Sequence, residues 1–254
     1  MPDEFHSAEE KERYIQSTFS TIASRYDLIN QVFTFNSDRR WRRKTAYYSA
    51  VGIGGTALDV CCGTGELAQA LAERVGRRGH VVALDFNHDM LEVAREKQRQ
   101  RLLEPQIEFI QGNAMELPFE DNRFDAATVG FGLRNVPDYR QALREMTRVI
   151  RPGGTVVCLE TSKPVSTGLR LLHGLYVDHF IPMLDKMAAG RQGPYAWLAR
   201  STQAFLSQEE LAQVFRDIGL INVRYYNLFG GAAAIHVGYK PANPISPSHT
   251  GESS

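Results

Sequence analysis

The chain of 254 residues contains only three cysteines, Cys61, Cys62 and Cys158. Adjacent cysteines are poorly placed to pair with each other, and no spacing of cysteine and histidine matches a zinc site. The sequence therefore indicates neither a disulfide framework nor a structural zinc module. We interpret the cysteines as small buried residues at strand ends, in a reducing compartment such as the cytoplasm of a bacterium.

An excess of either charge is also absent, because 29 Lys and Arg balance 29 Asp and Glu. This balance does not steer the protein toward nucleic acid. No apolar run approaches the roughly 18 residues of a membrane-spanning helix, and the start, Met1–His6, lacks the basic and apolar regions of a secretory signal. We therefore expect a cytoplasmic globular protein, for which 43% hydrophobic and 23% charged residues are ordinary.

The sequence also lacks a metal-binding pattern. His173, Asp178 and His179 come closest to a ligand cluster. The six-residue separation of the two histidines does not stack them on one face of a helix. We expect no metal site.

The most informative segment that is present covers residues 56–65. An apolar stretch includes the carboxylate Asp59, the turn Gly63-Thr64-Gly65 follows, and apolar residues then recur at helical spacing over 66–75. Glycine lets the backbone approach a ligand with no Cβ in the way, and the start of a helix presents unpaired N–H groups. This strand, turn and helix indicate a site for a nucleotide-like cofactor.

The spacing alone leaves two cofactors open. Gly63-x-Gly65-x-x-Ala68 fits the dinucleotide fingerprint, and Asp85 ends the next expected strand, within reach of a ribose. This pattern allows NAD. Asp59 speaks against NAD because a carboxylate beside the turn repels a pyrophosphate. S-adenosylmethionine carries an ammonium and a sulfonium, so Asp59 and Asp85 together favour it. The tyrosine pairs of the chain also lack the Tyr-x-x-x-Lys spacing of one class of NAD oxidoreductase.

After residue 55, expected strands and helices alternate, which is typical of a parallel sheet in an α/β fold. Two apolar stretches at the end of the fold follow each other directly, which predicts seven strands with the last one antiparallel. Beyond a first strand and helix within 56–75, the expected strands are 80–85, 106–110, 124–130, 155–160, 221–228 and 232–239, and the expected helices are 88–101, 138–150 and 208–218. Ser207 and Glu210 match a capping box at the start of the last helix.

Less regular segments surround this core. We expect a helical N-terminal cap at 1–50, a cofactor-binding domain at 51–240 with a substrate cap at 165–206, and a disordered tail rich in Pro and Ser at 241–254. Both caps contain apolar stripes, and ligands bind beyond the carboxyl ends of parallel strands. Apolar caps at that edge indicate an apolar substrate, although the same stripes also suit packing on the core.

Four segments carry a resemblance to a known family. They are Arg25-Tyr26-Asp27-Leu28-Ile29-Asn30 with Arg40-Trp41-Arg42; Leu58–Gly65; Gly130-Phe131-Gly132-Leu133-Arg134-Asn135-Val136; and Arg148–Gly154 with Glu160–Pro164. The chain resembles the class I S-adenosylmethionine-dependent methyltransferases and, more narrowly, the C-methyltransferases of menaquinone and ubiquinone biosynthesis. The match extends to Gly230-Gly231 and His236, and so covers nearly all of residues 10–240.

The resemblance implies a seven-stranded, Rossmann-like sheet, S-adenosyl-L-methionine as cofactor and a prenylated quinol as substrate. It implies C-methylation of demethylmenaquinol, toward which Gly130 also leans because some relatives have Ser at that position. A ubiquinol precursor or another apolar small molecule is the alternative acceptor. A protein that binds S-adenosylmethionine without catalysis is a less favoured alternative, because such a protein need not keep an apolar substrate pocket.

The resemblance also implies roles for individual residues in holding the cofactor. Gly63, Thr64 and Gly65 should hold its methionine end, with Asp59 near its ammonium. Asp85 should accept from both ribose hydroxyls, which suits a carboxylate. The remaining expected contacts are Phe86 on the adenine, Asn113 and Ala114 at the adenine edge, and the backbone of Gly130.

For catalysis, a quinol is a better carbon nucleophile than a quinone, and loss of a hydroxyl proton raises the electron density of its ring. Arg134 and Asn135, in the loop after the fourth strand, are expected to stabilise the quinolate oxygen, because Arg is too basic to act as a base. Tyr26 is expected to close the pocket from the N-terminal cap. His236 is a candidate proton acceptor, although a single histidine on an apolar strand is more often a core residue.

The run Arg39-Arg40-Trp41-Arg42-Arg43-Lys44 is the one dense basic patch of the sequence. It suits either contact with anionic lipid headgroups or a solvated helix face with a buried Trp. Since a prenylated quinol resides in the bilayer, we expect transient contact with the inner face of the membrane. No second basic patch supports binding to nucleic acid, and a homodimer is left open.

Overall fold

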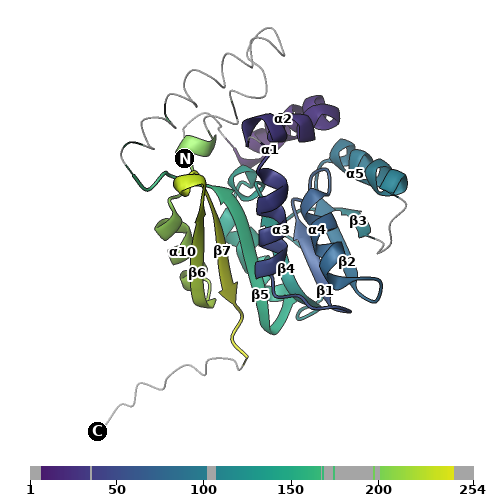
Figure 1. Ribbon diagram of the computed structural model, residues 1–254, viewed down its shortest axis with the longest axis vertical. Coiled ribbons are helices and arrows are strands. Elements are labelled where there is room, and N and C mark those ends of the chain that lie inside the picture. The colour runs from purple at the N-terminus through teal and green to yellow at the C-terminus, as the bar shows by residue number, and fades with distance from the viewer. Residues whose placement is uncertain are drawn as a thin grey trace.

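The structure, a computed structural model, describes residues 7–34, 36–101, 107–166 and 201–242, together with Gly168, Gly174 and Trp197. Figure 1 shows a twisted sheet with helices on both faces and further helices beyond one of its ends. Most of the predicted substrate cap at 165–206 lies outside the described residues, as do His173, Asp178, His179 and the tail after residue 242.

The sheet contains seven strands. They are β1 (Thr56–Val60), β2 (His80–Asp85), β3 (Ile107–Gln111), β4 (Phe124–Gly130), β5 (Ile150–Thr161), β6 (Ile221–Leu228) and β7 (Ala233–Tyr239). Their order is β3-β2-β1-β4-β5-β7-β6. β1 to β5 run parallel, whereas β7 is antiparallel to both β5 and β6. The predicted α/β class, the seven strands and the antiparallel last strand are confirmed.

Alternate residues of β1 explain how the two faces of the sheet are covered. Leu58 and Val60 belong to one core, which includes residues of α6 (Tyr139–Val149) and α10 (Gln208–Asp217). Ala57 belongs to the opposite core, which includes residues of α3 (Asp38–Tyr48), α4 (Glu66–Val75) and α5 (His88–Arg101). Successive side chains of a strand point to opposite faces, so a strand that is apolar throughout requires helices on both sides.

Two N-terminal helices lie outside these layers. α1 (Ala8–Ile22) and α2 (Tyr26–Phe33) lie beyond the end of the sheet in Figure 1, joined by a short 3₁₀ turn at Ala23–Arg25. α3, by contrast, packs beside α4 on a face of the sheet. Of the residues in the predicted N-terminal cap, those of α1 and α2 lie beyond the end of the sheet, and those of α3 belong to a helical layer. The division of the chain into domains stays a prediction.

Strand β5 begins earlier than predicted. The expected turn Pro152-Gly153-Gly154 lies inside β5, where the register with β4 shifts between the pair Phe124–Ile150 and the pair Ala126–Thr155. The intervening residues form a bulge, which accommodates a proline that has no N–H for the ladder. Helix α6 accordingly ends at Val149, one residue before the predicted end.

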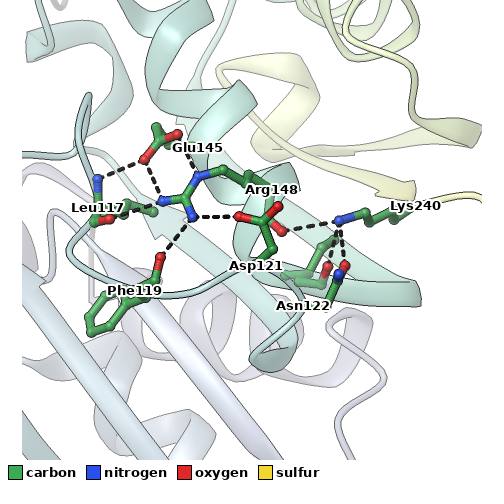
Figure 2. Close-up of polar contacts among 8 residues, drawn as sticks. Leu117, Phe119, Asp121, Asn122, Glu145, Arg148 and Lys240 are labelled. Carbon is green, nitrogen blue, oxygen red and sulfur yellow. Dashed lines mark hydrogen bonds and ion pairs between the residues drawn. The ribbon is translucent and has the colours of Figure 1, made fainter.

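An arginine at the end of α6 fixes the loop that leads into β4 (Figure 2). The Arg148 guanidinium donates to the carbonyl oxygens of Leu117 at 2.9 Å and Phe119 at 2.7 Å. It also pairs with Asp121 and Glu145, each at 2.8 Å. Such charge-assisted contacts are stronger than neutral hydrogen bonds. They anchor a loop whose first residues line the pocket described below.

Two expected absences can be compared with the described part of the chain. No helix within it has both the length and the apolar character needed to cross a membrane. Among the same residues, no three His, Cys, Asp or Glu side chains gather where they would hold a metal ion.

Candidate functional site

A cavity of about 740 Å³, its open mouth included, lies at the carboxyl ends of the parallel strands. Its walls come from the residues that follow β1, β2, β3 and β4 and from side chains of α1 and α2. The location is that of a small-molecule site in an open α/β sheet. The sequence-predicted residues that line it are Tyr26, Gly63, Asp85, Phe86, Asn113, Ala114, Gly130 and Asn135. Asp59, Thr64, Gly65, Arg134 and His236 do not line it.

The glycine turn after β1 contributes one glycine to the cavity. Gly63 lines the cavity and has a φ of 53°, in the left-handed region that favours glycine. Gly65 also has a positive φ, 81°, but a Cβ there would lie 3.1 Å from the Phe109 ring. Packing against β3 therefore explains Gly65, whereas the sequence interpretation assigned it to the ligand.

The Thr64 side chain is turned away from the cavity as well. It is buried, and its hydroxyl donates to Oδ1 of Asp27 at 2.6 Å. Sequence reasoning did not single out Asp27, although it lies in the segment Arg25–Asn30 that carried the resemblance. Its position next to Tyr26 in the sequence was the signal that could have identified Asp27.

Asp85 is the carboxylate in the wall of the cavity. Its Oδ2 accepts from the Gly63 N–H at 2.7 Å and its Oδ1 from the Asn87 N–H at 2.9 Å. Burial raises the pKa of Asp85, and these backbone donors act in the opposite direction. Each carboxylate oxygen has a second lone pair, so Asp85 can accept from a ligand while it retains both backbone contacts.

Asp59 lies within β1, does not line the cavity and is 0% exposed. Its Oδ1 accepts from the Thr128 hydroxyl at 2.8 Å, and the Ala68 N–H also acts on the carboxylate, although Oδ2 makes no close hydrogen bond among the described residues. Burial raises the pKa of Asp59 to about 7, against the opposing effects of the Thr128 hydroxyl and of the nearby Arg42 charge. A buried carboxylate oxygen without a close hydrogen bond is costly, so a cationic group close to it would be favoured.

The segment after β3 forms the next wall. Asn113 and Ala114 line the cavity, and Asn113 Oδ1 accepts from the Met115 N–H at 2.9 Å. Gly130, at the end of β4, leaves little room for a side chain, because a Cβ there would lie 3.1 Å from the end of the Leu67 side chain. Apolar side chains such as Leu84 and Phe86 complete this side.

Arg134 and Asn135 lie in a 3₁₀ turn, η2 (Leu133–Asn135), that follows β4. Asn135 lines the cavity, and its Oδ1 accepts from the Trp197 indole N–H at 3.0 Å. The Arg134 guanidinium instead pairs with Glu160 at 2.6 Å and donates to the Phe131 carbonyl at 2.6 Å. The expectation that Arg134 contacts the substrate is therefore not supported by its location.

Sequence reasoning also missed Glu160 as the partner of Arg134. Glu160 lies near the end of β5, in the segment Glu160–Pro164 that carried part of the resemblance. A carboxylate near the end of an apolar strand was the available signal, as it was for Asp59 and Asp85.

His236 lies in β7, away from the cavity. It is 1% exposed, and its Nε2 contacts the carbonyl oxygen of Gln208 at 2.8 Å. Burial lowers the pKa of His236 to about 4, so the ring is neutral at physiological pH. The core interpretation of this histidine agrees with its location, whereas the candidate role as proton acceptor does not.

Helix α3 contacts one wall of the cavity through the ring of Phe131. Phe131 lines the cavity with a φ of 60°, and the Arg42 guanidinium lies 5.6 Å from the centroid of its ring. Trp41 contacts the same ring, with centroids 6.3 Å apart. The basic run is thus divided, because Arg42 is buried while Arg39, Arg40, Arg43 and Lys44 are exposed.

These features fit S-adenosylmethionine. Asp85 offers a carboxylate in the wall for two hydroxyl donors, and Asp59 adds a buried carboxyl group in β1, four residues before Gly63. The surrounding wall is mostly apolar, which suits an adenine ring and a methyl group. The arrangement of a carboxylate near β1 and another at the end of β2 favours a cationic nucleoside over a pyrophosphate.

Comparisons with known proteins agree with this site. The ubiE/COQ5 methyltransferase family model matches residues 7–240. A demethylmenaquinone methyltransferase of Bacillus licheniformis is 48% identical over 230 residues, which cover 91% of this chain and 98% of the relative. The enzyme of the same name from Bacillus cereus is 47% identical over 231 residues, which cover 91% of this chain and 97% of the relative.

Solved structures show the same fold at low identity. A SAM-dependent methyltransferase from Aquifex aeolicus superposes with a TM-score of 0.57 at 20% identity, covering 78% of this chain and 88% of that one. A putative S-adenosyl-L-methionine-dependent methyltransferase from Methanococcus maripaludis gives 0.61 at 19% identity, covering 89% and 95%.

The family and the fold together identify S-adenosyl-L-methionine as the cofactor and set the NAD alternative aside. The match spans the cap helices, the glycine turn and the final strands, so it includes every part of the cavity. The chain belongs to the ubiE/COQ5 methyltransferase family.

Proposed function

We propose that this enzyme methylates a ring carbon of a reduced, prenylated quinol, and that demethylmenaquinol is its acceptor. Relatives that are 46–48% identical, and that match over nearly their whole length, are named demethylmenaquinone methyltransferases. The observation that carries the proposal is the apolar part of the cavity wall. It is lined by Ile15 and Phe19 of α1 and by Phe131 and Val136 after β4.

The chemistry explains why an apolar pocket is sufficient. The cofactor supplies a methyl group that is already electrophilic because it is bound to a sulfonium. The protein therefore has to align a carbon nucleophile with that methyl group and exclude water. A quinol ring is electron-rich and a quinone ring is not, which is why the proposal specifies the reduced form.

Residues on the β1–β3 side are proposed to hold the cofactor. Asp85 accepts from the ribose hydroxyls, Phe86 lies on the adenine, and Asn113 with Ala114 contacts the adenine edge. The backbone of Gly63 faces the methionine end, and Asp59 attracts the ammonium with its buried carboxyl group. Gly130 contributes its backbone. Thr64 and Gly65 shape the turn and are not assigned a direct contact.

Residues after β4 are proposed to act on the acceptor. Because Trp197 donates to the Asn135 carbonyl oxygen, the Asn135 amide is oriented with its NH₂ as the remaining donor. That donor would stabilise negative charge that develops on the quinol oxygen. Arg134 acts indirectly, since it holds the Phe131 carbonyl. Tyr26 closes the pocket from α2.

A ubiquinol precursor is the second candidate acceptor. Both quinols present a ring carbon beside a prenyl chain and a flanking hydroxyl, so the same apolar wall and the same Asn135 amide suit either ring. Another apolar small molecule and binding without catalysis are the remaining alternatives, and both predict no methylated quinol in the experiment below.

The experiment is mass spectrometry of a reaction that contains purified protein and S-adenosylmethionine. Chemically reduced demethylmenaquinone, its oxidised form and a reduced demethoxy-ubiquinone precursor serve as parallel acceptors. We expect a gain of one CH₂ on the reduced naphthoquinol, with an equal amount of S-adenosylhomocysteine. Methylation of the benzoquinol alone would mean that the acceptor is a ubiquinol precursor and not demethylmenaquinol. No product on any quinol despite cofactor binding would overturn the proposal.

We also infer that this cytoplasmic enzyme contacts the inner face of the membrane, where its substrate resides. On α2, Leu28 and Val32 are 63% and 45% exposed. Arg39, Arg40 and Arg43, exposed on the following helix, add positive charge. Exposed apolar side chains and exposed cations on consecutive helices suit an anionic lipid surface, to which each cation contributes about 1 kcal/mol.

Sedimentation with vesicles tests this contact. We expect binding to vesicles of phosphatidylglycerol and weaker binding to neutral vesicles, with loss on Leu28→Glu together with Val32→Glu. Ile53→Glu is the matched control, because Ile53 is also exposed but precedes β1, at the other end of the strand from the cavity. Equal loss with both variants would contradict an oriented contact.

A further inference from the structure

Lys97, on α5, connects its own helix to α2, to the glycine turn after β1 and to the start of α4. Its Nζ donates to Asp27 Oδ2 of α2 at 2.7 Å, to the Thr64 carbonyl oxygen at 3.0 Å, and to Glu66 of α4. An ammonium group has three N–H donors and no acceptor, so these three contacts use its full capacity. These three contacts therefore fix the position of the Lys97 ammonium group.

Asp27 completes this cluster from the other side. One of its carboxylate oxygens pairs with Lys97, and the other accepts from the Thr64 hydroxyl at 2.6 Å. Both contacts are charge-assisted, which makes them stronger than neutral hydrogen bonds. Through Asp27, helix α2 is therefore attached directly to the glycine turn after β1.

The neighbour of Asp27 in the sequence lines the cavity. Tyr26 is the first residue of α2, and a Cβ on Gly63 would be in van der Waals contact with its ring, at 3.9 Å. The Tyr26 ring also packs edge-on against Phe19 of α1, with centroids 5.8 Å apart. Any movement of α2 away from the turn would therefore carry Tyr26 out of the cavity wall.

Helix α1 has an equivalent attachment to the turn after β2. The Asn87 amide donates to the Gln16 carbonyl oxygen and to the Ser20 hydroxyl, each at 3.0 Å. The Asn87 N–H is also the donor to Asp85. Both cap helices are thus bound by polar contacts to the two turns that bear the proposed cofactor contacts.

We propose that Asp27 is a positioning residue for the cofactor pocket: with Thr64 and Lys97 it fixes α2 on the glycine turn and so keeps Tyr26 in the cavity wall. The proposal rests on the proposed function only in taking this cavity as the cofactor site. It explains why Thr64, between two glycines, carries a hydroxyl that does not reach the cavity.

The cluster is suited to positioning more than to global stability. The side chains of Asp27, Lys97 and Glu66 are 30%, 21% and 15% exposed. Partly solvated pairs contribute little to the free energy of unfolding, and α2 is not part of either layer that covers the sheet. Loss of the cluster should therefore change the local order of α2 and the affinity for cofactor, while the melting temperature stays almost constant.

The test compares Thr64→Val, which removes the hydroxyl with almost no change of shape, with Thr64→Ser, which retains it. Asp27→Asn keeps an acceptor for Thr64 and removes the charge that pairs with Lys97. Arg99→Gln is the matched control, because Arg99 lies on the same helix α5 in an exposed ion pair with Glu96. Hydrogen exchange of residues 26–33, the dissociation constant for S-adenosylmethionine and the melting temperature are measured for each variant.

We expect faster exchange of residues 26–33 in Thr64→Val and Asp27→Asn, with no change in α6. Cofactor binding should be about tenfold weaker, because loss of a charge-assisted hydrogen bond lowers the fraction of molecules in which Tyr26 is in place, and the apparent affinity falls with that fraction. Thr64→Ser and Arg99→Gln should match the wild type. Unchanged exchange and affinity in Thr64→Val and Asp27→Asn would overturn the proposal, as would equal effects of Val and Ser. None of these measurements uses a quinol, so failure of the proposed methylation would leave their outcome interpretable.

Discussion

The guanidinium of Arg134 and the carboxylate of Glu160 form an ion pair of 2.6 Å in which the two side chains are only 3% and 1% exposed. Arg134 also holds the Phe131 carbonyl, and Glu160 accepts from the Thr161 N–H at 2.7 Å. The pair therefore joins the wall of the cavity after β4 to the end of β5. Because the pair is shielded from water, removal of one partner leaves an uncompensated buried charge.

Glu160→Gln should lower the free energy of unfolding by about 3–5 kcal/mol, since it leaves the buried Arg134 charge without a partner. The double variant Arg134→Met with Glu160→Gln should lose less than the sum of the two single variants, as measured by urea denaturation. Arg140→Gln is the control, because its ion pair with Asp217 is exposed and should contribute about 1 kcal/mol or less. Strictly additive losses would show that the pair is not coupled.

Asp85→Ala should weaken binding of S-adenosylmethionine by about 100-fold or more, because two hydrogen bonds to a charged acceptor are lost. Titration calorimetry measures the dissociation constant. Asp89→Ala is the control, since Asp89 lies four residues away at the exposed start of α5. Arg134→Met, which leaves Asp85 in place, should retain binding and lose turnover. Normal affinity in folded Asp85→Ala would remove Asp85 from the cofactor site.

Asp59 predicts a pH dependence of stability. Its pKa rises from 3.8 to about 7 on folding, so the folded state holds a proton that the unfolded state releases between these values. The free energy of unfolding should therefore fall as pH rises from about 4 to about 7, by an amount of order 4 kcal/mol, and level off above pH 7. Asp59→Asn should flatten this dependence in denaturation curves measured at several pH values. A parallel decline in the variant would assign it to other groups.

The buried His236 predicts a dependence of the opposite sign. Its pKa falls from 6.5 to about 4 on folding, so the unfolded state binds a proton more readily within this range. The contribution of His236 to the free energy of unfolding, of order 3 kcal/mol, should be present in full above pH 6.5 and be lost as pH falls toward 4. His236→Gln should show a weaker loss in acid. Its turnover per folded molecule should keep the wild-type pH profile, and a shifted profile would restore His236 as a catalytic candidate.

Local patterns were sufficient to predict the sheet. The bounds of β2, β4, β6 and α5 agree with the prediction, because apolar runs and helical spacing depend on neighbouring residues. Asp85 is placed in the cavity wall by the same rule, since parallel strands end at one edge. The bulge in β5 was not foreseen, because a Pro-Gly-Gly segment is compatible with either a turn or an interrupted strand.

Long-range contacts account for what the sequence did not reveal. Arg134 and Glu160 are 26 residues apart, and Asp27 and Thr64 are 37 apart. No periodicity specifies which charged residue a buried guanidinium will pair with, or that a threonine between two glycines will turn its hydroxyl to a helix. The residues of the cavity were therefore predicted more reliably than the residues that hold them in position.

The placement of β7 between β5 and β6 determines the order in which the sheet is completed. During synthesis on the ribosome, β6 emerges before β7, yet it joins the sheet only through β7. Until residues 233–239 have emerged, the outer edge of β5 remains open, and an open edge is a template for pairing with another chain. Helix α10 packs on the same two late strands. We therefore expect the nascent chain to be prone to aggregation at the open edge of β5 until β7 has paired with it.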